Sequence, residues 1–128
     1  MQYAILCYHD EKVTCSWSKE EDDAVMAKLG VVMERLSREG KLGPVARLLP
    51  TTAATTLRKD REPHLVIDGP FAETKEQLLG LYVVNCADET EAIEIARDLR
   101  RVNPSAVYEI RPIRLYLPGE ALAETAQE

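Results

Sequence analysis

Two short runs of this sequence are apolar at both odd and even positions: YAILCY at residues 3–8 and LLGLYVVNC at residues 78–86. Each is brief and is soon followed by charged residues, so each predicts a β-strand rather than a helix. A strand with one face in water alternates apolar and polar residues, because successive side chains point to opposite faces. Both runs therefore predict strands of a sheet that is covered on its two faces.

Two amphipathic helices are marked by their capping residues. Ser18 with Glu21, and Asp88 with Glu91, have the spacing of a capping box at a helix N-terminus. Gly40 ends the first helix, and the NP pair at 103–104 ends the second. Apolar residues recur at helical spacing at Val25, Met26, Leu29, Val32, Met33 and Leu36, and again at Ala92, Ile95, Ala96 and Leu99.

The remaining segments predict further strands. GPVARLLP at 43–50 is one, and TTAATTLRK at 51–59 forms a hairpin at an exposed edge with HLVID at 64–68. AVYEIRPI at 106–113 is the last strand. The order strand, helix, strands, strand, helix, strand predicts a ferredoxin-like α+β sandwich with an inserted β-hairpin and a mainly antiparallel sheet.

The number of helices is too small for the sheet that these strands form. A helix is about 10 Å wide and strands lie about 4.8 Å apart, so two helices cover roughly one face of a sheet of four to six strands. A second copy of the chain, packed sheet to sheet about a two-fold axis, is the simplest cover for the other face. We therefore expect a homodimer of a single domain at 1–117, with an acidic tail at 118–128 that is mobile or docks in the dimer.

Composition narrows the class of partner. With 128 residues and a formal charge of -6, the chain fits one domain and lacks the basic surface that nucleic acid or an anionic membrane requires. The start has no signal-peptide pattern and no window is long enough to span a membrane. Three cysteines without a CxxC pair favour the reducing cytoplasm. No metal-ligand cluster or nucleotide motif is present in the sequence, so no cofactor is expected.

Four segments together resemble the DGPF-type branch of the YCII-related family over nearly the whole chain. They are YAILCYHDE, ATTLR, DGPFAETKEQLLGLY and the closing YEIRPI. The resemblance implies a ferredoxin-like subunit that forms a dimeric α+β barrel, and a bacterial gene that often neighbours one for an extracytoplasmic-function sigma factor. It implies no established reaction. The chain departs from the family pattern at LLGLY, where Gly80 stands without the second glycine, and at His64.

The run DGPFAETKE, from Asp68 onward, has a structural and a functional interpretation. As structure, Asp68 caps a turn, Gly69 takes a positive φ, and Phe71 anchors the loop to the core, while Glu73 and Lys75 are solvated. As function, Phe71, Glu73 and Lys75 are candidate binding residues of a ligand site, because binding residues favour loops on a rigid scaffold. The sequence leaves both open.

His9 and Asp68 are the candidate catalytic residues. Both are expected at strand ends, where His9 could act as general base with Asp68 orienting its ring. Asp10 is a candidate binding residue that points away from His9, because neighbours on a strand alternate faces. The plainer interpretation of His9 is a surface histidine, and His64 is expected to be an exposed hairpin residue.

Three more side chains complete the candidate binding set. Arg111 interrupts the last strand, where it either forms an ion pair or holds a substrate carboxylate by two hydrogen bonds. Tyr8 and Tyr82 could offer hydroxyl groups to the same cavity, although each also fits an ordinary core position.

Two functions fit these residues. The first is a cofactor-free enzyme that transfers a proton on a small anionic organic substrate, with His9 or Asp68 as base and Arg111 as anchor. The second is a non-catalytic ligand-binding or accessory protein linked to sigma-factor signalling. A purely structural dimer module is a third interpretation, but it gives the DGPF segment no role.

Overall fold

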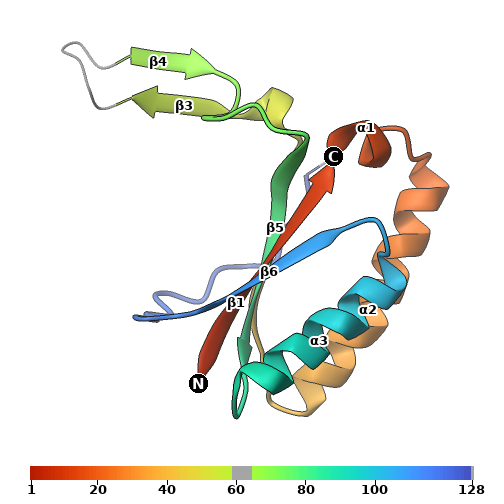
Figure 1. The fold of residues 1–128 in the computed structure, drawn as a ribbon, viewed down its shortest axis with the longest axis vertical. Coiled ribbons are helices and arrows are strands. Elements are labelled where there is room, and N and C mark those ends of the chain that lie inside the picture. The colour runs from red at the N-terminus through yellow and green to blue at the C-terminus, as the bar shows by residue number, and fades with distance from the viewer. Residues whose placement is uncertain (59–64, 128) are drawn as a thin grey trace.

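The computed structural model describes residues 1–58 and 65–127, which form an α+β sandwich and a separate β-hairpin (Figure 1). The main sheet has four antiparallel strands in the order β2-β5-β1-β6. These strands are β1 (Gln2–Asp10), β2 (Leu42–Arg47), β5 (Glu76–Asn85) and β6 (Val107–Pro112). The helices are α1 (Glu11–Thr14), α2 (Lys19–Arg38), α3 (Glu89–Val102) and a short 3-10 helix, Thr51–Ala53. The predicted ferredoxin-like order is confirmed.

Both long helices begin at the predicted capping residues. The Ser18 hydroxyl accepts a hydrogen bond from the Glu21 backbone N–H at 3.1 Å, and the Glu21 carboxylate accepts one from the Ser18 N–H at 3.3 Å. Asp88 accepts from the Glu91 N–H at 2.9 Å. After α2 ends, Gly40 adopts a φ of 70°. None of the helices in the described ranges combines the length and the apolar character needed to cross a membrane.

The core lies between one face of the sheet and the pair of helices α2 and α3. Across β1 and β5, Tyr3 pairs with Val84 and Ile5 pairs with Tyr82, and all four side chains are buried. The helices contribute Leu29 and Leu36 from α2, and Ala92, Ile95, Ala96 and Leu99 from α3. Figure 1 shows the two helices side by side on this side of the sheet.

The opposite face of the sheet is also apolar but carries no helix from the described part of the chain (Figure 1). Here Ala4 pairs with Val83 and Leu6 pairs with Leu81, and these side chains are half-buried. We call this surface the open face. The strands are apolar on both faces, but the described part of the chain covers only one face of the sheet with helices.

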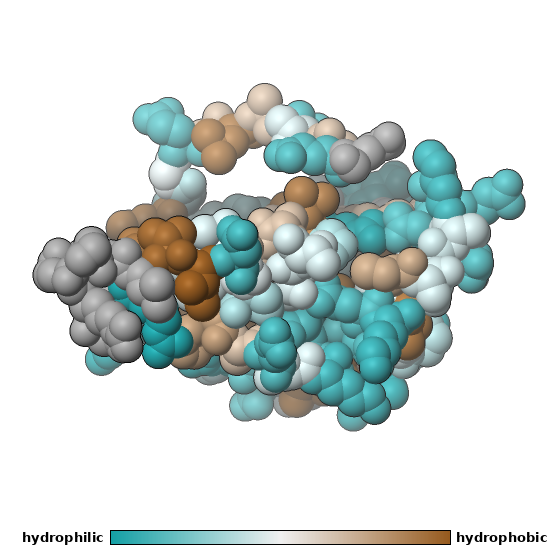
Figure 2. All heavy atoms as spheres, turned by 90° about the horizontal axis from the view of Figure 1, so that it is seen from above, coloured by the Kyte–Doolittle hydropathy of each residue, from teal (hydrophilic) through white to brown (hydrophobic). Residues whose placement is uncertain are grey.

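The inserted hairpin forms a second sheet that stands apart from the first. Its strands are β3 (Thr55–Arg58) and β4 (Leu65–Asp68), which pair antiparallel as predicted, but they do not join an edge of the main sheet (Figure 1). The side chains of Leu57 and Val66 are 64% and 60% exposed, and Figure 2 shows hydrophobic surface gathered on this hairpin. A two-stranded hairpin is marginally stable alone, so this element gains from further packing.

Candidate functional site

The sheet separates two hollows. The first, which we call the helix-side cavity, lies between α2 and strands β1, β2 and β5 and has a volume of about 80 Å³. Its walls include Cys7, His9, Trp17, Met26, Arg47 and Asn103. The second, the signature groove, measures about 620 Å³ and is bordered by Tyr8 and Leu78 of the open face and by part of the DGPF segment. Neighbouring residues of β1, Tyr8 and His9, thus belong to different hollows.

His9 is the most buried polar side chain of this site, with only 2% of the residue exposed. Its Nε2 lies 3.0 Å from the Ser105 hydroxyl, and its ring meets Trp17 edge to face at a centroid distance of 5.4 Å. Its Nδ1 has no hydrogen-bond partner among the described residues. The surface position that we considered for His9 is wrong, because β1 continues to Asp10 and keeps His9 on the core face with Tyr3 and Ile5.

Asn103 is a second buried polar side chain at the same cavity, with 6% of the residue exposed. It follows the last turn of α3, and its Nδ2 donates a hydrogen bond to the Tyr108 hydroxyl at 3.3 Å. Its Oδ1 has no partner in the described part of the chain. Sequence reasoning read the NP pair only as a helix stop, so it missed this residue.

Arg47 brings a cation to the cavity wall, but Asp22 pairs with it. The guanidinium donates two hydrogen bonds to the Asp22 carboxylate, at 3.1 and 2.7 Å, across the gap between β2 and α2. These bonds hold the pKa of Asp22 below its ordinary value and raise the pKa of Arg47. The pair therefore contributes little net charge to the cavity.

The Tyr82 and Cys7 side chains in the cavity wall are neutral at pH 7. Burial raises the pKa of the Tyr82 hydroxyl to about 12. Burial also raises the pKa of the Cys7 thiol, and a hydrogen bond with Tyr108 only partly opposes that shift. The predicted role of Tyr82 as a cavity residue fits its place in this wall. Neither side chain offers a thiolate or phenolate nucleophile there.

The structure does not bring Asp68 to His9. Asp68 is an exposed residue at the end of β4, and it borders neither hollow. Gly69 has the predicted positive φ, at 104°, and its N–H donates to the Ala54 carbonyl at 2.6 Å. The turn at Asp68 and Gly69 is therefore held by its hydrogen bond to Ala54, the residue just before β3, and Asp68 does not reach the cavity that His9 borders.

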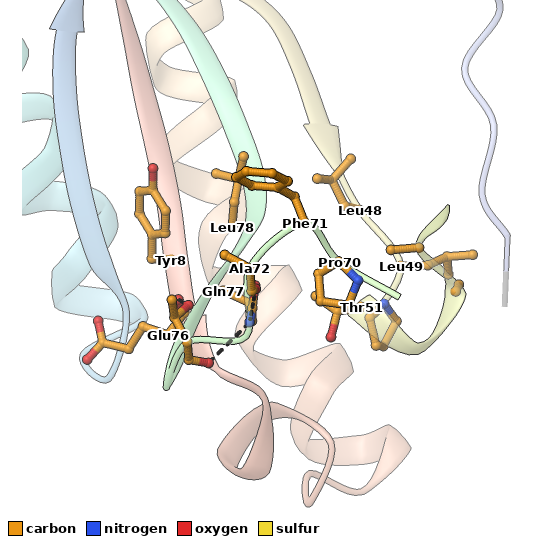
Figure 3. A pocket seen from close by; sticks show the side chains of 14 residues that line it. Tyr8, Leu48, Leu49, Thr51, Pro70, Phe71, Ala72, Glu76, Gln77 and Leu78 are labelled. Carbon is orange, nitrogen blue, oxygen red and sulfur yellow. Dashed lines mark hydrogen bonds between the residues drawn. The ribbon is translucent and has the colours of Figure 1, made fainter. Parts of the chain in front are cut away.

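The exposure of Phe71 shows that one prediction was wrong. Phe71 was expected to anchor the loop in the core, but it is 75% exposed, because the hairpin and the segment after it stand away from the body of the protomer. The Arg58 guanidinium lies over its ring at 5.6 Å. Figure 3 shows Phe71 beside Leu78 and Leu48 at the signature groove, with Tyr8 on the neighbouring strand.

The remaining predicted binding residues are dispersed. The Tyr8 hydroxyl donates to the Glu109 carboxylate at 3.0 Å, and Asp10 accepts from the Lys12 N–H at 2.9 Å as the cap of α1. Arg111 pairs with Ala4 across β6 and β1, so it belongs to the open face and not to the side of His9. Glu73 and Lys75 are exposed and border neither hollow. His64 lies outside the described residues.

In the described ranges, no group of three or more His, Cys, Asp or Glu side chains is placed to hold a metal ion. The residues with polar side chains that border the helix-side cavity can hydrogen-bond to an organic molecule; they are Cys7, His9, Thr14, Trp17, Arg47, Tyr82 and Asn103.

Comparison with known proteins places the chain in a family. The family model of the YCII-related domain matches residues 1–116. The chain is also 60% identical, over 121 residues, to an uncharacterised protein of Rhizobium meliloti (strain 1021), a match that covers 94% of this chain and 98% of that protein. The protein therefore belongs to the YCII-related family.

Proposed function

We propose that this YCII-related chain is a small-molecule module in which His9 transfers a proton to or from a ligand in the helix-side cavity, without a cofactor. The observation that carries the proposal is the state of the His9 ring: it is buried, its Nε2 is held by Ser105, and its Nδ1 lacks a partner among the described residues. An imidazole that is held in place by one hydrogen bond and borders a cavity can serve in general acid–base catalysis.

The bond to Ser105 allows His9 to act in either direction. When Nε2 donates to the Ser105 hydroxyl, Nδ1 carries a lone pair and can accept a proton. Once Nδ1 has accepted a proton, the ring is an imidazolium whose Nε2 still donates to Ser105 and whose Nδ1 can return that proton to the ligand. Asp68 is not part of this proposal for a single protomer, because it borders neither hollow.

We further propose that the module works as a homodimer, with the open faces of two protomers packed against each other as in a dimeric α+β barrel. The half-buried Leu6, Leu81 and Val83 support this, because an apolar sheet face of this kind is rarely left in water. The exposed Leu57 and Val66 of the hairpin, and the tail at 118–127, supply further surface for the partner protomer.

Exchange of carbon-bound hydrogen with solvent tests the proton transfer directly. In D2O, we expect the protein to accelerate loss of the α-proton signals of hydroxyacetone or 2-butanone, measured by 1H NMR. The variant His9→Gln keeps a polar side chain of similar length and should lower that rate about 100-fold or more. The exposed helix variant Ser37→Ala serves as control and should match wild type. Equal rates of hydrogen exchange in His9→Gln and in wild type would contradict the proposal.

A non-catalytic ligand-binding or accessory protein is the second candidate. It is favoured by the signature groove, where the 75% exposed Phe71 lies beside Leu48 and Leu78 (Figure 3). A link to sigma-factor signalling, implied by the resemblance, would fit such an exposed apolar surface. Binding of small carbonyl compounds without any solvent exchange would favour this candidate over the enzyme.

A further inference from the structure

The open face presents its central side chains in two rows that run across the strands. Residues that lie directly opposite one another on β6, β1 and β5 point to the same face of the sheet. The first row consists of Arg111, Ala4 and Val83, and the second of Glu109, Leu6 and Leu81. The row between them points to the helices and packs in or against the core; it consists of Ile110, Ile5 and Tyr82. Each open-face row therefore joins one charged residue on the edge strand β6 to two apolar residues.

These two charged residues are not paired with each other. The Glu109 carboxylate accepts a hydrogen bond from the neutral Tyr8 hydroxyl at 3.0 Å, and Arg111 forms no hydrogen bond or ion pair within the described ranges. Both Glu109 and Arg111 are exposed. A protein surface that covers them must bring opposite charge to each, because a charge that is desolvated without a partner is costly.

A second copy of the chain can cover the open face in two ways. Sheets that pack face to face keep their strands roughly aligned, so the two-fold axis between them runs either along the strands or across them. An axis along the strands, through the middle of the sheet, places β6 over β2 of the partner. The charged residue of β2 is Arg47, which lies on the helix side and is paired with Asp22. This arrangement leaves Glu109 and Arg111 without partners.

An axis across the strands gives both charges a partner. When it runs over the row of Ile5, it places the first row of each protomer over the second row of the other. Arg111 then faces Glu109 of the other protomer, and the two-fold axis repeats this contact. The apolar residues of the rows also meet: Ala4 faces Leu6, and Val83 faces Leu81. Because Ile5 lies near the middle of β1, the two sheets overlap along most of their length.

The hairpin of β3 and β4 favours the same axis. Figure 1 shows it at one end of the main sheet, on the side away from α2 and α3, which is the side of the open face. An axis along the strands brings both hairpins to the same end of the dimer, where they compete for one space. An axis across the strands brings them to opposite ends, so that each hairpin can lay its exposed Leu57 and Val66 on the other protomer.

We propose that two protomers pack about an axis across the strands, with Arg111 of each protomer bonded to Glu109 of the other, and that these two ion pairs set the register of the dimer. This inference rests on the homodimer of the proposed function and names the contact that orients it. Arg111 is an interface residue in this arrangement.

Charge reversal in the full chain tests the register. Arg111→Glu makes both facing positions acidic, and Glu109→Arg makes both basic, so each variant should dimerise about tenfold or more weakly than wild type. A chain with both substitutions has opposite charges at the facing positions again, and its Kd should return to within about threefold of the wild-type value. Sedimentation equilibrium measures the three Kd values against wild type.

Mixing the two single variants gives a second measurement. An equimolar mixture of Arg111→Glu and Glu109→Arg should form clearly more heterodimer than the share of about one half that random pairing gives. Native mass spectrometry measures that share, because the two chains differ in mass. The matched control pair is Arg38→Glu and Glu34→Arg, which makes the same charge changes at exposed positions of α2 and should pair at random.

The inference is overturned if the single variants dimerise as tightly as wild type, if the double substitution is as weak as the single ones, or if the mixture forms no more heterodimer than the control pair. When any of these results comes with a wild-type dimer that Leu81→Lys dissociates, the homodimer stands and its register is wrong. A monomeric wild-type chain contradicts both the homodimer and the register.

Discussion

His9 shows how the position of one residue within a strand decides its environment. His9 was predicted as a candidate catalytic residue, but the predicted strand ended at Tyr8, so the burial of His9 was not predicted. The strand continues to Asp10, and the alternation that buries Tyr3 and Ile5 also buries His9. Asn103 was missed for a different reason: its burial depends on the contact with Tyr108, which no local pattern signals.

The pair Arg47 and Asp22 makes stability depend on pH. Because the Arg47 hydrogen bonds hold the Asp22 pKa below its ordinary 3.8, the pair stabilises the fold above that pH and loses its effect as pH falls through the folded-state value. We expect Asp22→Asn to lower the free energy of unfolding at pH 7 by about 1 kcal/mol or less, since both side chains are partly exposed. Urea unfolding at pH 7 and pH 3 measures this.

The matched control is Asp23→Asn, which removes the more exposed ion pair with Lys19. It should have a smaller effect than Asp22→Asn at pH 7. An Asp22→Asn deficit of the same size at pH 3 as at pH 7 would show that the carboxylate charge is not responsible.

At the scale of elements, short sequence patterns correctly predicted the features that depend only on neighbouring residues, such as where helices begin. The N-cap residues Ser18 and Asp88 placed the starts of both long helices, and the β-branched runs placed the hairpin of β3 and β4. The four-residue α1 was not predicted, because one turn is too short for a periodic pattern. The place of Phe71 was predicted wrongly, since whether a hairpin packs on its own protomer is a tertiary property that the hairpin sequence does not contain.

Helix α2 forms one wall of the helix-side cavity, so its cap affects the site as well as the fold. Ser18→Ala removes the hydrogen bond to the Glu21 N–H and should lower the free energy of unfolding by about 1 kcal/mol. Thermal or urea unfolding followed by circular dichroism measures this. Ser37→Ala, near the other end of the same helix, should change stability far less; equal losses in the two variants would argue against a special role for the cap.

At the scale of the whole molecule, the strands that are apolar on both faces were the sequence feature that predicted most about the architecture. They predicted cover on both faces, and a single protomer supplies α2 and α3 on one face only. Composition and periodicity therefore predicted the sandwich, and they also predicted a second chain on the open face, which remains a prediction. They could not locate the cavity, which depends on how α2 lies over the sheet.

Charge on the open face tests the proposed dimer. Leu81→Lys places a cation opposite Leu6, where a partner sheet would have to bury it, and should convert a dimer into monomers. Sedimentation velocity measures the change. Val31→Lys, on an exposed position of α2, is the matched control and should remain dimeric. A wild-type chain that sediments as a monomer at all concentrations would contradict the proposal.

The shared wall of the two hollows has an evolutionary consequence. Tyr8 and His9 are neighbours on β1, and the register with β5 shifts between Cys7 and Tyr8. The unpaired residue at this shift is Leu79 of β5, and β1 itself continues without an insertion. Deletion of one residue from β1 before Tyr8 would turn the strand end by one position. The imidazole would then move to the open face and the phenol to the side of the helices, so homologues that differ there by one residue should be sorted by length before their residues at these two positions are compared.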